Sequence, residues 1–387
     1  MYKHMKTIKF ALPDISKIEI DNVKKTLKTG WITSGKEELK FENILKKKFK
    51  KKYCIIFNSW TSAAFTLFYF LKKKNKYSEV LMPSLSFIAC ANAPFLAGHN
   101  VKFSDVDLDT FNISLNQIKK KITNKTNIIL TVDQIGNPCD IKSIKKYAKQ
   151  KGIILVHDAA CSLGSKIDKK DIGNESDYLL FSFHARKPIT SGEGGALLTN
   201  DKKIYNLSKL YKNHGMDKNT FVRSKISPTS YEKYILNGLN FKFTDIQASL
   251  LNAQIKRLNF FLNKRAKIRK LYDKFFYQHK KIVVIQREIK NAKSNNQSYM
   301  IVFKKNNLRD QLIKYLFNNK IETRKGITAI HLEIAFQNKF KNLKLTNSEL
   351  IAKNGLQLPM HSKLTVKDCK KIIKLINSFF VLKGLYE

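Results

Sequence analysis

Lys187 follows an expected strand at residues 178–183 and precedes a turn that contains Gly192, Gly194 and Gly195. Glycines let backbone segments approach closely, and a lysine amine at the end of a strand is suited to attack a carbonyl group. Most lysines, however, are solvated surface residues, and three glycines can also form a plain hairpin. Lys187 is therefore a candidate nucleophile, with a surface lysine as the alternative.

Asp158 ends a second expected strand, residues 153–157, and is followed by the small residues Ala159 and Ala160. An aspartate in this position commonly caps the N-terminus of a helix. It can also pair with a cationic nitrogen of a cofactor. Both interpretations are open on this residue alone.

Three hydroxyl residues, Ser59, Thr61 and Ser62, lie between a strand at 53–57 and a helix expected from residue 63. Hydroxyls and free backbone N–H groups at a helix N-terminus form an anion site, and an ordinary helix cap has the same residues. The GxxxxGK[ST] motif of nucleoside triphosphatases is absent from the sequence. A phosphate site, an aspartate and a lysine at successive strand ends are together what a pyridoxal phosphate enzyme needs.

The elements that would position these residues alternate between strand and helix as far as residue 200, which indicates a mostly parallel sheet covered on both faces. Ligands bind such sheets at the carboxyl ends of the strands. We expect one long helix at 244–276 and then a smaller α+β domain, with a division into residues 1–250 and 251–387. Residues 216–236 are polar and irregular, which is typical of a long loop. The expected strands span residues 53–57, 79–82, 101–104, 128–132, 153–157, 178–183 and 196–199.

Nearly the whole chain resembles the DegT-type nucleotide-sugar aminotransferases, which are fold type I pyridoxal phosphate enzymes. The most specific block is SFHARK, residues 182–187, followed by GEGG at 192–195. The resemblance implies an α/β fold, with a three-layer α/β/α large domain, a mostly parallel sheet and a smaller C-terminal α+β domain. The other matching segments are residues 31–35, 59–63, 82–89, 158–160, 213–216, 240–247 and 358–361.

The resemblance also implies roles around the cofactor ring. Lys187 would form the Schiff base with pyridoxal 5'-phosphate and later shuttle a proton. Asp158 would keep the pyridine nitrogen protonated, and Phe87 would stack on the ring. Cys161 stands where the family usually has a Gln or His that bonds the phenolic oxygen, and a thiol is a weak donor.

Further roles concern the phosphate and the substrate. By resemblance, Thr61, Ser62 and Ser182 would bind the cofactor phosphate, and Asn240 would reach the phosphate in the neighbouring subunit of a homodimer with shared active sites. His331 would lie near the sugar nucleotide.

Two further departures from the family pattern concern Trp60 and Lys242. Trp60 replaces a small residue, and Lys242 replaces a common Arg, which loses a two-pronged donor.

Family dehydratases have His in place of the lysine, so Lys187 favours transamination. We expect an amino acid such as glutamate to donate its amino group to a nucleotide-diphosphate keto-sugar. The alternative is another fold type I reaction, by a sugar dehydratase or a lyase.

The composition narrows the other possibilities. The chain has 387 residues and a net charge of +43, but its lysines are spread over many expected helix faces, which favours a solvated surface over a specific nucleic-acid site. Five cysteines without a CxxC spacing argue against a disulfide scaffold and against a zinc site or other metal centre built on paired cysteines. Neither a signal peptide nor a membrane-spanning segment is visible, and we expect a soluble, cytoplasmic protein.

Overall fold

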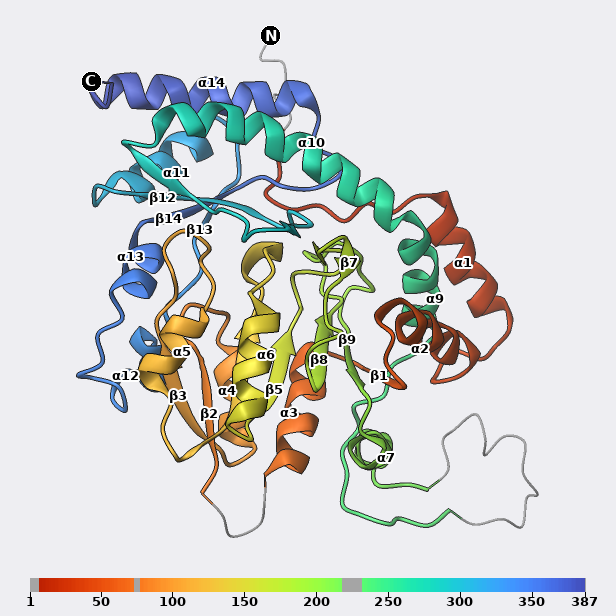
Figure 1. Cartoon of the computed structure of the whole chain (residues 1–387). Coiled ribbons are helices and arrows are strands. Elements are labelled where there is room, and N and C mark those ends of the chain that lie inside the picture. Colours follow the sequence, from red (N-terminus) through yellow and green to blue (C-terminus); the bar gives the residue numbers. More distant parts are fainter. Residues whose placement is uncertain (1–6, 73–76, 218–231, 387) are drawn as a thin grey trace.

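The computed structural model describes residues 7–72, 77–217 and 232–386. Its centre is a seven-stranded sheet with the order β1-β9-β8-β5-β4-β2-β3 (Figure 1). Strand β9 pairs antiparallel with both of its neighbours, and the other pairings in the sheet are parallel. The strands are β1 (Tyr53–Phe57), β2 (Glu79–Pro83), β3 (Asn100–Ser104), β4 (Thr126–Val132), β5 (Ile154–Asp158), β8 (Tyr178–Ser182) and β9 (Gly195–Thr199).

Both faces of this sheet are buried because its strands carry apolar residues at almost every position. Val80 and Met82 of β2 belong to the hydrophobic cluster on one face, whereas Leu81 belongs to a cluster on the other. One face packs against α3 (Trp60–Leu71), α4 (Ala89–Leu96) and α7 (Lys202–Tyr211). The opposite face packs against α2 (Lys36–Phe49), α5 (Leu115–Lys121), α6 (Ile141–Gln150) and α9 (Asp245–Gln254). The expected three-layer arrangement is confirmed.

The long helix expected at 244–276 is interrupted. Helix α9 ends at Gln254, a 3-10 turn covers Ile255–Arg257, and α10 follows as Leu258–Phe276. Apolar residues of α9 pack in the core of the large sheet, and the second half of α10 packs in a separate C-terminal core. The turn therefore lies where the helix changes the core that it covers.

A second sheet lies in the C-terminal part, with four antiparallel strands in the order β10-β12-β14-β13. Helices α10 and α14 lie side by side over it (Figure 1). The smaller α+β unit is thus present, while the division at residue 250 remains a prediction. The strands and helices here are β10 (Val283–Ile285), β12 (Tyr299–Phe303), α11 (Leu308–Asn318), β13 (Arg324–Lys325), α12 (Ile334–Gln337), α13 (Thr346–Asn354), β14 (Gly355–Leu358) and α14 (Val366–Leu382).

The N-terminal segment joins the C-terminal sheet before it enters the large domain. The Ile8 N–H donates to Lys320 O at 2.9 Å, and the Glu322 N–H donates to Ile8 O at 2.9 Å. Helix α1 (Lys17–Lys28) then packs beside α9. A small third sheet joins β11 (Ala292–Lys293) to β6 (Lys166–Ile167) and β7 (Lys170–Asp171).

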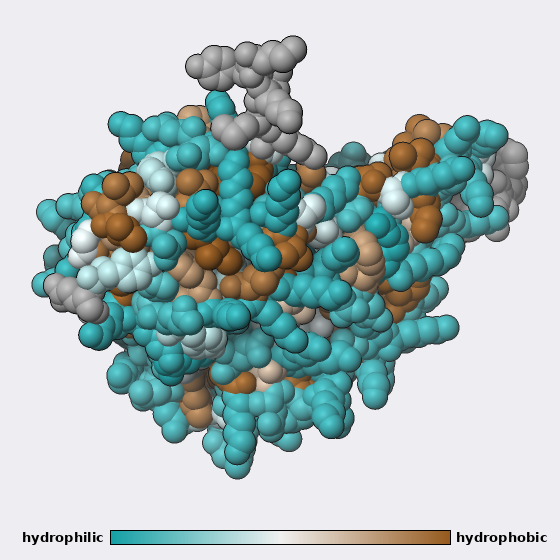
Figure 2. Space-filling model, turned by 90° about the horizontal axis from the view of Figure 1, so that it is seen from above, coloured by the Kyte–Doolittle hydropathy of each residue, from teal (hydrophilic) through white to brown (hydrophobic). Residues whose placement is uncertain are grey.

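The surface over α10 and α14 is mostly hydrophilic, with separated apolar patches (Figure 2). This distribution agrees with lysines spread over several helix faces. Within the described ranges, no helix combines the length and the apolar character that crossing a membrane requires. Most of the loop expected at 216–236 falls in residues 218–231, outside the described residues.

Candidate active site

A cavity of about 510 Å³ opens at the carboxyl ends of the parallel strands, where residues 324–328 of the C-terminal unit face it. The chain reaches this edge directly after β1, β2, β4, β5 and β8, and each of these positions contributes residues to the wall. The cavity brings together eight residues singled out in the sequence, namely Ser59, Trp60, Thr61, Phe87, Asp158, Cys161, Ser182 and Lys187.

Asp158 is the last residue of β5, and only 3% of it is exposed. Its Oδ1 accepts hydrogen bonds from the Ala160 N–H at 2.9 Å and the Trp60 Nε1–H at 3.0 Å. Its Oδ2 accepts one from the Cys90 thiol at 3.3 Å. Burial raises the pKa of Asp158, although the Ala160 N–H, the Lys187 ammonium and the Cys90 thiol oppose the shift. Residues 159–165 form turns and loops, so Asp158 caps no helix here.

Lys187 lies in a turn that follows β8, and its Nζ donates to Cys161 Sγ at 3.1 Å. The same turn leads into β9, which pairs back on β8, so the hairpin interpretation of the glycines is also correct. Gly195 has a further reason to be glycine, since a Cβ there would lie 2.4 Å from Ser59 O. The missing side chain lets β9 approach the start of α3.

The N-terminus of α3 carries a cap and borders the cavity. Ser59 Oγ accepts from the Ser62 N–H at 3.1 Å, and the Ser62 hydroxyl donates to Asn58 Oδ1 at 2.6 Å. Ser62 therefore serves the cap and does not line the cavity. Thr61 is exposed and lines the cavity. The start of a helix also presents backbone N–H groups without helical partners and the positive end of the helix dipole.

Phe87 has 70% of its surface exposed and lines the cavity. Its neighbour Ser86 donates its N–H to Thr328 O at 3.1 Å, and the Thr328 hydroxyl returns a bond to Ser86 O at 3.1 Å. This exchange fixes residues 324–328 beside the exposed ring. An exposed aromatic ring on a cavity wall is suited to cover a flat ligand.

The family model for the DegT/DnrJ/EryC1/StrS aminotransferase family matches residues 13–377. The chain belongs to this family. One relative is the UDP-4-amino-4,6-dideoxy-N-acetyl-beta-L-altrosamine transaminase of Campylobacter jejuni (strain 81-176). It is 30% identical to this chain, and the alignment covers 94% of this chain and 95% of the relative. GDP-perosamine synthase of Escherichia coli O157:H7 is 29% identical, with 97% and 99% covered. The solved aminotransferase PseC of Helicobacter pylori superposes with a TM-score of 0.90 at 27% identity, covering 97% of this chain and 99% of that one. The fold type I resemblance is therefore confirmed.

Two residues that were expected to take part in the active sites, His331 and Asn240, do not line this cavity. His331 is buried, with its Nδ1 2.7 Å from Ser84 Oγ and its Nε2 3.3 Å from Glu349 Oε1, and it does not line the cavity. Its position gives no support to a contact with substrate. Asn240 is exposed and forms a bridge to Asn213, outside the cavity of its own chain. Lys242 does not line the cavity either.

Sequence reasoning missed several residues of this aminotransferase site. Cys90 lies in the first turn of α4, and its sulfur accepts a hydrogen bond from the Ser86 hydroxyl at 3.1 Å, which no local sequence pattern indicated. The cations Arg324 and Lys325 and their neighbour Thr328 come from a distant part of the chain, and no local pattern connects them with residue 87. Arg186 directly precedes Lys187 in the sequence, but no pattern in the sequence indicated that it lines the cavity.

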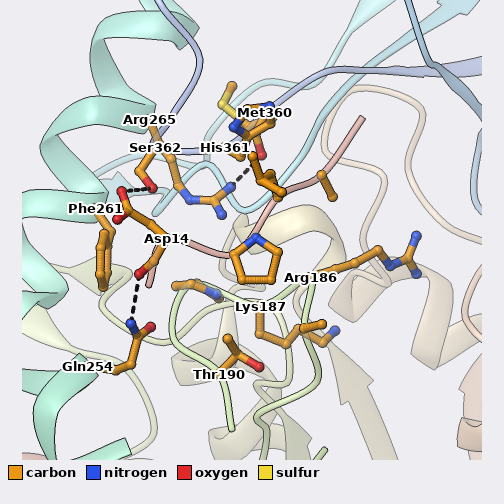
Figure 3. A pocket seen from close by; sticks show the side chains of 15 residues that line it. Asp14, Arg186, Lys187, Thr190, Gln254, Phe261, Arg265, Met360, His361 and Ser362 are labelled. Carbon is orange, nitrogen blue, oxygen red and sulfur yellow. Dashed lines mark hydrogen bonds between the residues drawn. The ribbon is translucent and has the colours of Figure 1, made fainter. Parts of the chain in front are cut away.

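A smaller cavity of about 20 Å³ lies beside the Lys187 turn (Figure 3). Asp14 holds one side, where its Oδ2 accepts from the Ser362 hydroxyl at 2.8 Å. Arg265 is buried on the other side and donates to Met360 O at 2.9 Å, and burial lowers the pKa of this guanidinium to about 10. Segments from both ends of the chain thus line the cavity beside the turn that carries Lys187.

Proposed function

We propose that this chain is a pyridoxal phosphate-dependent aminotransferase that moves an amino group from an amino acid, glutamate in the simplest case, to a nucleotide-linked keto-sugar. One observation carries the proposal. A lysine amine and a buried carboxylate line one cavity at the carboxyl ends of parallel strands, in a chain that belongs to an aminotransferase family. The relatives named above act on UDP-linked and GDP-linked sugars by their names.

The residues of the cavity fit this cofactor. Pyridoxal phosphate supplies a carbonyl that takes up an amino group and a ring that withdraws electrons. The buried Asp158 carboxylate would hold a proton on the ring nitrogen, and the exposed Phe87 ring would cover one face. Thr61, the N-terminus of α3 and Ser182 would bind the phosphate.

Lys187 has two tasks in this proposal. Its Nζ would hold the cofactor before the amino acid arrives, and it would then carry the proton between the carbon and nitrogen atoms of the substrate. Cys161 Sγ, at 3.1 Å, is a polar partner that would orient the amine without neutralising it. The cavity walls would limit the access of water during proton transfer.

Three cationic side chains at the rim of the cavity favour an anionic substrate. Arg186, Arg324 and Lys325 are exposed and line the cavity, and within the described ranges none of them forms an ion pair. A nucleotide sugar presents a diphosphate, which guanidinium groups bind with paired hydrogen bonds. We therefore place the diphosphate at this rim.

We further propose a homodimer in which Asn240 serves the neighbouring active site. Asn240 is exposed and lies outside the cavity of its own chain. Apolar side chains are exposed on the outer helices: Ile18, Ile20 and Leu27 on α1 and Leu39 on α2. A second copy that covered them would bury surface that water disfavours. A cytoplasmic location belongs to the same proposal.

The test begins with the cofactor. Purified protein should show a visible absorption band, and borohydride should fix the cofactor onto Lys187, as a peptide map would report. Lys187→Ala should lose the band and the label, whereas the matched variant of the exposed Lys304, Lys304→Ala, should keep both. A label on another lysine would overturn the assignment.

Analysis of the products distinguishes transamination from dehydration. A panel of nucleotide-linked keto-sugars with glutamate should yield one 2-oxo acid per aminated sugar. A dehydratase would consume sugar without a stoichiometric 2-oxo acid. This comparison is needed because GDP-4-keto-6-deoxy-D-mannose 3-dehydratase of Yersinia pseudotuberculosis is also a relative, at 26% identity.

A further inference from the structure

Trp60 lies in the active-site wall with its indole directed at the buried carboxylate. It is the first residue of α3, and 8% of its surface is exposed. Its Nε1–H donates to Asp158 Oδ1 at 3.0 Å. Trp60, Cys90 and Asp158 all line the large cavity.

The hydrogen bonds to Asp158 are unequally divided between its two oxygens. Oδ1 receives the Trp60 indole and the Ala160 N–H, whereas Oδ2 receives only the Cys90 thiol among the described residues. A thiol is a weak donor, and each carboxylate oxygen can accept two bonds. Oδ2 therefore keeps the capacity for one strong donor, and Oδ1 does not.

The charge of the carboxylate follows from the same contacts. Burial raises the pKa of Asp158 and so favours its neutral form. A hydrogen bond donated to the carboxylate favours the ionised form. An indole N–H can only donate a hydrogen bond, so it cannot accept one from a protonated Asp158 carboxyl. Burial, with the charge of Asp158, also raises the pKa of the Cys90 thiol, which stays protonated and remains a donor.

We propose that Trp60 is a positioning residue that anchors Oδ1 of Asp158 in the ionised state and leaves Oδ2 to the ring nitrogen of the cofactor. The inference rests on the proposed function, because that function supplies the pyridine ring. It also gives a physical reason for a tryptophan at a position where the sequence led us to expect a small residue.

The experiment compares two probes in Trp60→Phe, which keeps an aromatic ring but removes the donor. The first probe is pyridoxal phosphate, and the second is its 1-deaza analogue, in which C–H replaces the ring nitrogen. We expect the dissociation constant of pyridoxal phosphate to rise about tenfold or more, as for the loss of a hydrogen bond to a charged group. The constant for the analogue should stay unchanged, because the analogue offers nothing to Oδ2.

A double variant separates positioning from packing. In an Asp158→Ala background, Trp60→Phe should have no further effect on pyridoxal phosphate affinity, because its target is gone. Equal weakening of both probes, or an undiminished effect in that background, would show that Trp60 only packs. Either result overturns the proposal.

Two controls keep the test decisive. Trp31→Phe removes an indole that donates to Ser34 O, and it should leave cofactor affinity unchanged. Trp60→His is the second variant, in case Trp60→Phe does not fold. Its ring carries an N–H, so it should recover affinity for pyridoxal phosphate only if hydrogen-bond donation to Asp158 matters. Wild-type protein that binds no pyridoxal phosphate would defeat the proposed function itself. Wild-type binding with an unaffected Trp60→Phe would defeat only the present inference.

Discussion

Asp158 accepts three hydrogen bonds and still faces the cavity, which combines a structural and a chemical task in one side chain. The sequence left a helix cap and a cofactor contact as alternatives. Because turns follow β5 at this point, the cap is excluded. The chemical task can therefore be tested without the loss of a helix.

We expect Asp158→Asn to fold and to bind cofactor, but to lose activity by at least about a hundredfold. A neutral amide cannot hold the ring nitrogen in its charged form. Steady-state kinetics and a melting curve on the same preparation check this. A purely structural role for Asp158 would lower the melting temperature and leave turnover nearly intact. A variant that melts early but turns over normally would contradict the prediction.

The sequence predicted the site where residues follow strand ends. Lys187 and Asp158 could be placed because one follows and the other ends a recognisable apolar strand, whereas Ser182 was expected from the family resemblance. His331 could not be placed, because its partner Ser84 is 247 residues away in the chain. Local patterns report strand ends, but they do not report which distant loops fold over them.

At the scale of elements, α2 carries a half-buried acid, Glu42. Glu42 accepts the Ile56 N–H at 3.0 Å, and burial raises the pKa of Glu42 to about 7. The buried Lys212 lies nearby, bonded to Glu38 and to Ile56 O at 2.8 Å, and its charge opposes that shift. This group of charges holds α2 on β1 and makes the contact sensitive to pH.

Glu42→Gln should stabilise the protein at pH 8 and change little at pH 5. Between its unfolded pKa of 4.5 and its folded pKa of about 7, Glu42 holds a proton only in the folded state. Its contribution to stability therefore falls as the pH rises through this window, by up to about 3 kcal/mol. Chemical unfolding at both pH values measures the gain.

The control for this experiment is Asp21→Asn, since Asp21 is exposed on α1. It should show no such difference between the two pH values. An equal effect of Glu42→Gln at pH 5 and pH 8 would exclude a titrating Glu42 as the cause.

Elements with a clear period were predicted from the sequence, and those set by distant packing were not. The seven strands of the large sheet fall within two residues of their expected starts and ends. The break at Ile255–Arg257 was missed because apolar periodicity continues across it, while the packing partner changes. Helix α13 was missed because its sequence, TNSELIAKN, has few apolar residues, and Ile351 buries its side chain against the C-terminal sheet.

At the scale of the whole molecule, the proposed shared active site predicts complementation. Lys187→Ala lacks the amine and keeps Asn240, and Asn240→Ala has the opposite defect. If Asn240 acts across the interface, a mixed dimer contains one intact site and one site with both defects. Mixing and reassembling the two weak variants should then restore about half of the wild-type activity per mixed dimer.

The opposite outcome is equally clear. If Asn240 acts within its own chain, every site keeps one defect and mixing restores nothing. A fully active monomer in sedimentation would also contradict the proposal. Both measurements belong near physiological ionic strength, where a Debye length of about 8 Å screens the repulsion between two strongly basic chains.

The pairing of the N-terminal segment with the C-terminal sheet constrains the order of folding on the ribosome. Ile8 pairs with Lys320 and Glu322, and Phe10 accepts the N–H of Met360. These partners are synthesised more than 300 residues later, so the first strand-like segment must wait while the large sheet between them assembles. The hydrogen bond between Ser362 and Asp14, which lies in the wall of the small cavity beside the Lys187 turn, is consequently among the last contacts that a nascent chain can make.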